Sequence, residues 1–144
     1  MKTCLSSSLK KNISLFHRLL PLDSSFDFIT REINLGNTPC YFISINGMCD
    51  LEIIQRLFSD IQADNFQKKA LENHNSLPDF VKDQFFYAQI SFVDSVNDIL
   101  HNLLSGPSLL LLDGYSQALL IDTRKYPSRS TEEPDTEKVI QGAK

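Results

Sequence analysis

A β-hairpin pattern near the C-terminal end most constrains what this chain can fold into. Residues 108–112 are a mostly aliphatic run, Asp113-Gly114 follows, and residues 117–122 are again largely apolar. An Asp-Gly pair supplies the positive φ angles of a tight turn between antiparallel strands, and Tyr115-Ser116 would lengthen that loop. The pattern therefore predicts a hairpin, and with it a β-sheet.

Helical and strand-like patterns alternate through the rest of the chain. The predicted helices are 9–20, 51–61 and 96–104, and the predicted strands are 26–35, 39–45 and 85–93. Pro21 ends the first helix, Asp50 is the expected N-cap of the second, and Asp94 or Ser95 that of the third. Residues 63–84 are weakly patterned, and we expect a short helix and a loop there.

This order of elements predicts an α/β fold with two small lobes, each a short mixed sheet with flanking helices. The predicted division is an N-terminal helix at 1–22, a first α/β lobe at 23–84, a second α/β lobe at 85–125 and a linker at 126–144.

Composition and charge exclude several classes of protein. Hydrophobic residues make up 42% of the 144-residue chain and charged residues 22%, which is enough apolar material for a core. The net charge is −4, whereas binding to nucleic acid calls for clustered Lys and Arg, so no nucleic-acid partner is expected. No apolar run approaches the ~20 residues of a membrane helix, so we expect this piece to be soluble.

Catalytic and metal-binding patterns are weak. None of His17, His74 and His101 has a second ligand at metal spacing, so we expect no metal and no cofactor. The three cysteines are an odd number without Cys-x-x-Cys spacing, which is typical of free thiols in a reducing compartment. Cys49 as a nucleophile would need a base brought to it by the fold. The sequence therefore predicts a protein that is not an enzyme.

One loop is a candidate ligand site. Asn46, Gly47 and Asp50 lie where a predicted strand ends and a predicted helix begins, and ligands of α/β proteins often bind at such junctions. A single glycine is a weak phosphate loop, and the Asp50 carboxylate would repel an anion. A plain strand–helix turn is the favoured interpretation, with a small neutral or zwitterionic ligand as the alternative.

The last nineteen residues predict an exposed, charged linker. Pro134 suits the first position of a helix, and Asp135 and Glu137 suit its first turn, where the helix dipole is positive. Because this helix has barely begun when the sequence stops, we expect the piece to belong to a longer protein whose next element follows Lys144.

In the same segment Arg129, Glu133, Pro134, Glu137 and Gly142 carry a resemblance to a known family. Similar segments join the soluble N-terminal domain to the membrane domain in A subunits of GerA-type spore germination receptors, and the branch of stage V sporulation protein AF (SpoVAF) is the most similar. Residues 41–50 and 104–114 resemble two further segments of that family, in the same order, whereas Gln141 replaces the usual basic residue.

The resemblance implies a role in spore germination. It implies a full-length protein of the inner spore membrane, with this domain on the cytoplasmic or spore-core side. Implied partners are B- and C-type subunits or GerA-family homologues, together with homo-oligomerisation through the membrane part. The domain would then serve complex assembly and signal relay without catalysis. The alternative is a soluble regulatory α/β module that binds a small molecule near Asn46, Gly47 and Asp50.

Overall fold

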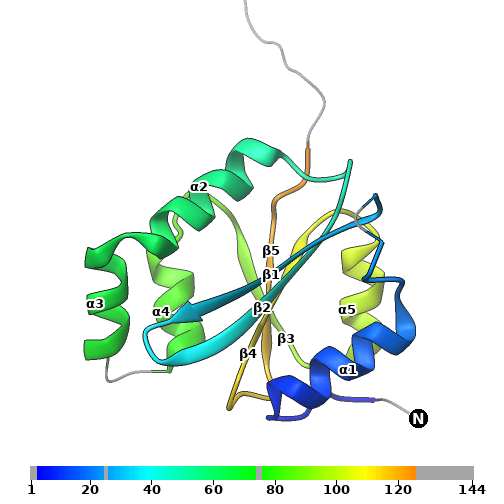
Figure 1. The fold of residues 1–144 in the computed structure, drawn as a ribbon, viewed down its shortest axis with the longest axis horizontal. Coiled ribbons are helices and arrows are strands. Elements are labelled where there is room, and N and C mark those ends of the chain that lie inside the picture. The colour runs from blue at the N-terminus through cyan, green and yellow to red at the C-terminus, as the bar shows by residue number, and fades with distance from the viewer. Residues whose placement is uncertain (1–2, 25, 74–75, 126–144) are drawn as a thin grey trace, which may run out of the picture.

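The computed structural model describes residues 3–24, 26–73 and 76–125 of the chain, drawn in colour in Figure 1. The helices of this part are α1 (Leu9–Leu19), α2 (Leu51–Gln62), α3 (Asp64–Glu72), α4 (Leu77–Gln84) and α5 (Val96–Leu103). Its strands are β1 (Phe28–Leu35), β2 (Thr38–Ile45), β3 (Ile90–Val93), β4 (Ser108–Leu112) and β5 (Ala118–Ile121).

The strands form a single antiparallel sheet in the order β1-β2-β4-β5-β3. Two hairpins, β1–β2 and β4–β5, lie side by side, and their seam pairs Cys40 with Leu112 and Ile43 with Leu109. The short strand β3 is added to the outer side of β5. The hairpin predicted around Asp113-Gly114 is therefore confirmed, and it lies within the sheet.

Helices cover both faces of the sheet (Figure 1). In this view α2, α3 and α4 lie on one side and α1 and α5 on the other. Alternate residues of β4 belong to two separate apolar clusters. Leu110 and Leu112 pack with Leu57 on the α2–α4 side of the sheet. Leu109 and Leu111 pack on the side of α1 and α5. All five residues of β4 are buried because both faces of the sheet are covered.

The α/β class is confirmed, but the arrangement of the strands differs from the prediction. Strands of both predicted lobes share one antiparallel sheet, where we expected separate short mixed sheets. The β2–β4 seam joins residues roughly 70 positions apart, and a periodicity reports which residues are apolar without reporting which strand they will pair with.

Helix ends follow the local sequence closely. Asp50 is the N-cap of α2, as predicted, and its side chain accepts a hydrogen bond from the Glu52 N–H. Ser95 is the N-cap of α5, which decides between the two predicted candidates, and its hydroxyl accepts from the Asp98 N–H. An N-cap side chain of this kind satisfies one of the otherwise unpaired N–H groups of the first turn.

Two segments differ from the prediction. Residues 63–84 form two helices, α3 and α4, where we expected one short helix and a loop. Phe66 and Val81 anchor these helices on the sheet, so packing compensates for a weak local pattern. The predicted strand 85–93 is shortened to Ile90–Val93, since Phe85 ends α4 and turns inward to stack on Phe66.

Candidate functional site

The loop predicted as a ligand site forms a tight turn between β2 and α2. Gly47 has a φ of 89°, which only glycine adopts readily, and the Met48 N–H donates to the Ile45 carbonyl. The Asn46 side chain donates to the Phe26 carbonyl at 3.0 Å, which ties the loop to the start of β1. Asn46, Gly47 and Asp50 therefore lie in one structured loop.

Backbone hydrogen bonds join this loop to the last described residues of the chain. The Asp50 N–H donates to the Thr123 carbonyl at 2.7 Å, and the Lys125 N–H donates to the Met48 carbonyl at 3.0 Å. Between these bonds, Cys49 pairs with Arg124 as an isolated antiparallel bridge. We call residues 122–125 the exit segment and residues 46–50 the exit loop.

Three buried hydroxyls attach the exit segment to the sheet. Ser108 of β4 donates to Ser44 of β2 at 3.0 Å and is also hydrogen-bonded to Thr123. All three residues are inaccessible to solvent. Because one hydroxyl has one proton to give, Thr123 is then the donor to Ser108. Releasing the exit segment would remove the hydrogen bond between Thr123 and the buried Ser108 hydroxyl, which is costly.

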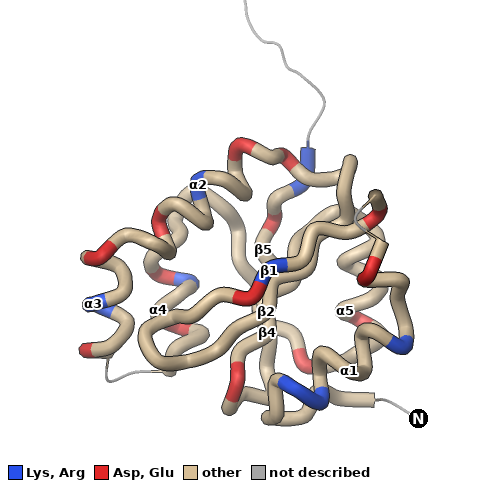
Figure 2. The backbone as a smooth tube through the Cα atoms, viewed as in Figure 1, with Lys and Arg blue, Asp and Glu red and all other residues tan. Residues whose placement is uncertain are grey.

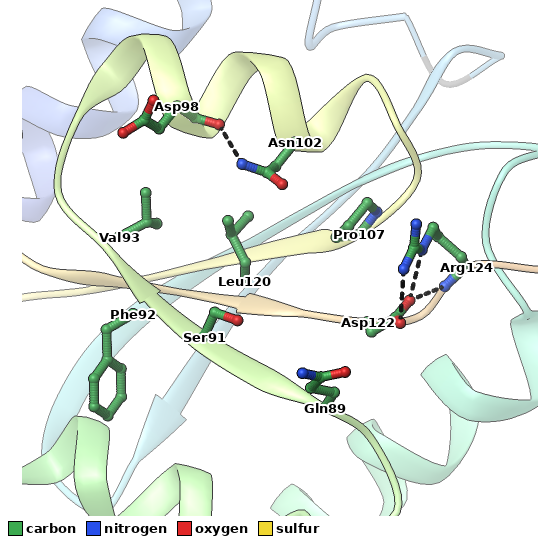
Figure 3. Close-up of a pocket in the computed structure, with 10 residues that line it drawn as sticks. All are labelled: Gln89, Ser91, Phe92, Val93, Asp98, Asn102, Pro107, Leu120, Asp122 and Arg124. Atoms are coloured by element: carbon green, nitrogen blue, oxygen red, sulfur yellow. Dashed lines mark hydrogen bonds and ion pairs between the residues drawn. The ribbon is translucent and has the colours of Figure 1, made fainter.

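The exit segment also contains an ion pair between Arg124 and Asp122. The guanidinium of Arg124 donates to both carboxylate oxygens of Asp122, from Nε at 3.0 Å and from Nη2 at 3.1 Å. Figure 3 shows the two side chains facing each other beside Pro107. The aliphatic stem of Arg124 lies over Gly106, where an added Cβ would clash with Arg124 Cγ. Gly106 therefore leaves the room that Arg124 needs.

Two hollows flank the exit segment. One, of about 410 Å³, lies between α5 and the β3–β5 edge, with Asn102 and Gln89 on opposite walls (Figure 3). The other, of about 300 Å³, lies at the exit loop itself. Its lining consists of the three predicted loop residues and their neighbours: Asn46, Gly47, Cys49, Asp50, Leu51, Glu52 and Lys125. The structure thus gathers the predicted loop residues around a cavity, and their binding of a ligand stays a prediction.

Other predicted residues lie apart from this site. His17 is exposed on α1 near Asp23, and His101 is exposed on α5. Within the described ranges no group of three His, Cys, Asp or Glu side chains is arranged to hold a metal ion. The linker residues Arg129, Glu133, Pro134, Glu137 and Gly142, the helix expected from Pro134, and His74 lie outside the described residues.

Sequence reasoning missed the residues that fasten the exit segment. Ser44 interrupts the apolar run of β2, and Ser108 begins the apolar run of β4. A hydroxyl inside a strand that is otherwise apolar signals a buried hydrogen bond, because an unpaired polar group there is costly. That signal was available for Ser44, whereas the contribution of Thr123 depends on a contact between strands that are distant in the sequence.

The fold and this site define a class of protein: a three-layer α/β domain whose outgoing chain is bonded to the loop between β2 and α2. Residues 17–144 match the sequence model of a family described as Bacillus/Clostridium GerA spore germination protein. This chain belongs to the GerA family of spore germination proteins. The resemblance inferred from the linker and the two upstream segments is therefore confirmed.

Curated relatives are considerably longer than this chain. Stage V sporulation protein AF of Bacillus subtilis (strain 168) is 32% identical over 134 residues, which are 93% of this chain and 27% of that protein. Spore germination protein GerLA of Bacillus cereus is 27% identical over 124 residues, 84% of this chain and 24% of that protein. The chain thus spans about a quarter of the length of these relatives.

A solved structure shares the fold. The N-terminal domain of the A subunit of the Bacillus megaterium spore germinant receptor GerK3 superimposes with a TM-score of 0.71 at 29% sequence identity. The match covers 88% of this chain and 50% of that one. None of the described helices in this chain has the length and apolar character that crossing a membrane requires.

Proposed function

We propose that this chain is a non-catalytic soluble domain of a spore germination protein, and that it serves complex assembly and signal relay. The observation that carries the proposal is the attachment of the exit segment to the exit loop through the Asp50–Thr123 and Lys125–Met48 hydrogen bonds. These bonds fix the position of Lys125, the last residue that the structure describes.

The relay would work through two states of the exit segment. In the described state Thr123 is bonded to Asp50 and to the buried hydroxyl of Ser108. A partner that binds the exit loop better in one state shifts the population of the exit segment by its differential affinity. The linker residues Arg129, Glu133, Pro134, Glu137 and Gly142 would pass this change to the rest of the protein.

The assembly part of the proposal is supported by exposed apolar side chains around the exit loop. Phe26 is 88% exposed and Leu51 54% exposed, and Met48 is also accessible. Apolar groups gathered in this way are typical of a contact surface. We propose B- and C-type subunits or GerA-family homologues as partners, homo-oligomerisation through a membrane part, and the spore-core side of the inner spore membrane as the location.

The test uses the full-length protein in spores. Thr123→Val removes the hydroxyl that fastens the exit segment and keeps the shape of the side chain. Ser95→Ala is the matched control, because it removes the N-cap of α5, at a cost of about 1 kcal/mol, without touching the exit. The relay predicts slower germination for Thr123→Val at unchanged protein level, and normal germination for Ser95→Ala. Equal behaviour of the two variants would contradict it.

The second candidate is a soluble small-molecule-binding regulatory module. The cavity of about 300 Å³ at Asn46, Gly47 and Asp50 favours it. Isothermal titration of the 144-residue chain against a panel of amino acids, sugars and nucleosides separates the two functions. Saturable binding that is lost in Asp50→Asn would support the module, whereas the relay alone predicts no saturable heat from the panel.

A further inference from the structure

Helix α1 carries positive charge only. Its residues include Lys10, Lys11 and Arg18 and no Asp or Glu, although the whole chain has a net charge of −4. Without these three residues the remaining charges sum to −7. Figure 2 shows the blue positions of α1 at the end of the molecule opposite the exit segment. The charge of this domain is therefore strongly asymmetric.

The basic residues share the solvent-facing side of the helix. Lys10, Ser14 and Arg18 follow each other at i, i+4 and i+8, which places them on one stripe, and Lys11 lies beside them. Together with Ser8 these side chains line a hollow of about 540 Å³. Leu9, Asn12 and Phe16 occupy the opposite, buried side. The outer side of α1 is thus a continuous cationic surface.

Neighbouring acidic groups leave this surface uncompensated. Among the described residues, no ion pair involves Lys10, Lys11 or Arg18. The carboxylate of Asp113 accepts from the Leu9 N–H at the start of α1, and Asp23 lies 3.8 Å from His17 Nδ1 near its end. Both acids are at the helix termini, so the central stripe faces solvent without a counter-charge.

We propose that the outer side of α1 docks this domain on an anionic lipid bilayer. Unpaired Lys and Arg on one helix face are attracted to anionic headgroups. Leu19, 46% exposed beside the stripe, adds an apolar group that can enter the headgroup region. An acidic protein surface is the other surface that would satisfy these charges, and the test below distinguishes the two. The inference rests on the proposed location beside a membrane.

The expected strength of the contact defines its role. Each basic side chain near an anionic membrane contributes about a fivefold factor to partitioning, so three give roughly a hundredfold factor. At physiological salt this is too weak to capture a free domain efficiently, so binding of the free chain is expected at low salt, where the charges are screened less. For a domain already tethered to the membrane it is enough to set its orientation, because tethering raises the local concentration of the surface.

The test is sedimentation of the 144-residue chain with vesicles of phosphatidylcholine alone or mixed with phosphatidylglycerol. A triple variant, Lys10→Gln, Lys11→Gln and Arg18→Gln, is compared with the control Lys68→Gln, Lys69→Gln and Lys82→Gln, which removes three exposed charges from α3 and α4. Both variants have the same net charge, so a difference between them reports position. Circular dichroism verifies that both are folded.

We expect binding only to vesicles that contain phosphatidylglycerol. The bound fraction should fall as the Debye length shortens from about 30 Å in 0.01 M salt to about 8 Å in 0.15 M salt. The α1 variant should lose binding by at least tenfold and the control should keep it. Equal losses in both variants, or no binding at low salt, would overturn lipid docking and would favour an acidic protein partner. The vesicle assay is independent of germination, so its failure would leave the relay intact.

Discussion

The N-terminal segment before α1 and the exit segment after β5 are both bonded to the sheet, but by different groups. The first is held from the β4–β5 turn, where the Gly114 N–H donates to Ser7 and the Asp113 carboxylate accepts from Leu9. The second is held by the exit loop through Asp50 and Met48. The N-terminal attachment therefore depends on a tight turn, and the C-terminal one on a loop beside a cavity.

The two attachments differ in how far apart in the sequence their hydrogen-bond partners lie. Residues around the N-terminal attachment satisfy one another locally, as the buried Asn12 does with both backbone groups of Ser6. The exit segment instead depends on Ser44 and Ser108, which come from two strands that are distant in the sequence. Under the proposed relay, a partner at the exit loop would act on the exit segment, whereas the N-terminal segment is held by other contacts.

The sharpest test of this comparison is a matched pair of glycine substitutions. Gly106→Ala should lower the free energy of unfolding by about 3 kcal/mol, because it adds strain at a φ of 119° to a clash with Arg124. Gly114→Ala, at a φ of 87° with nothing within 4 Å of the new Cβ, should lose about 1 kcal/mol. Urea unfolding measures both. Equal losses would mean that Arg124 is not held against Gly106.

The N-terminal attachment is tested by Asn12→Ala. This side chain is 2% exposed, and its removal strands the Ser6 N–H and carbonyl, so we expect a loss of about 2 kcal/mol in unfolding free energy. Ser14→Ala on the exposed side of the same helix serves as the control and should change stability little. Cys49 should remain unreactive towards iodoacetamide in Asn12→Ala, and a rise in its rate would couple the two attachments.

A smaller effect is expected at the hydroxyl of the exit segment. Thr123→Val should cost about 1 kcal/mol, because Ser108 loses a hydrogen-bond partner. Its characteristic result is faster alkylation of Cys49, which is 5% exposed and pairs with Arg124. Mass spectrometry of alkylated peptides gives the rate. An unchanged rate at Cys49 would show that the exit segment is held without Thr123.

The smallest effect is expected at Cys40, which pairs with Leu112 where β2 meets β4. Its thiol should not be alkylated in the folded protein. Burial raises the pKa of the Cys40 thiol to about 12, so only about one molecule in ten thousand carries the reactive thiolate at pH 8. The folded state holds this proton more tightly than the unfolded one, so the contribution of Cys40 to stability is complete below pH 9 and is lost as pH rises towards 12. Native-state labelling of Cys40 as fast as that of the exposed Cys4 would contradict this.

Much of the fold could be predicted where the signal is local. Asp50 and Ser95 cap their helices because side chain and N–H are two or three residues apart, and Asp113-Gly114 makes its turn for equally local reasons. The single sheet could not be predicted, since the pairing of Ile43 with Leu109 depends on tertiary packing. The candidate loop could be predicted because its residues are adjacent in the sequence. Its hydrogen bond to Thr123 could not, because Thr123 is more than 70 residues away.

The β2–β4 seam has a consequence for how this domain is made. The β1–β2 hairpin leaves the ribosome early, whereas β4, its partner at the seam, is translated roughly 70 residues later. Until β4 is made, the backbone N–H and C=O groups on one edge of β2 have no partner strand. Such an edge is prone to pair with other chains. We therefore expect this domain to complete its fold only after β4 and the exit segment have also been synthesised.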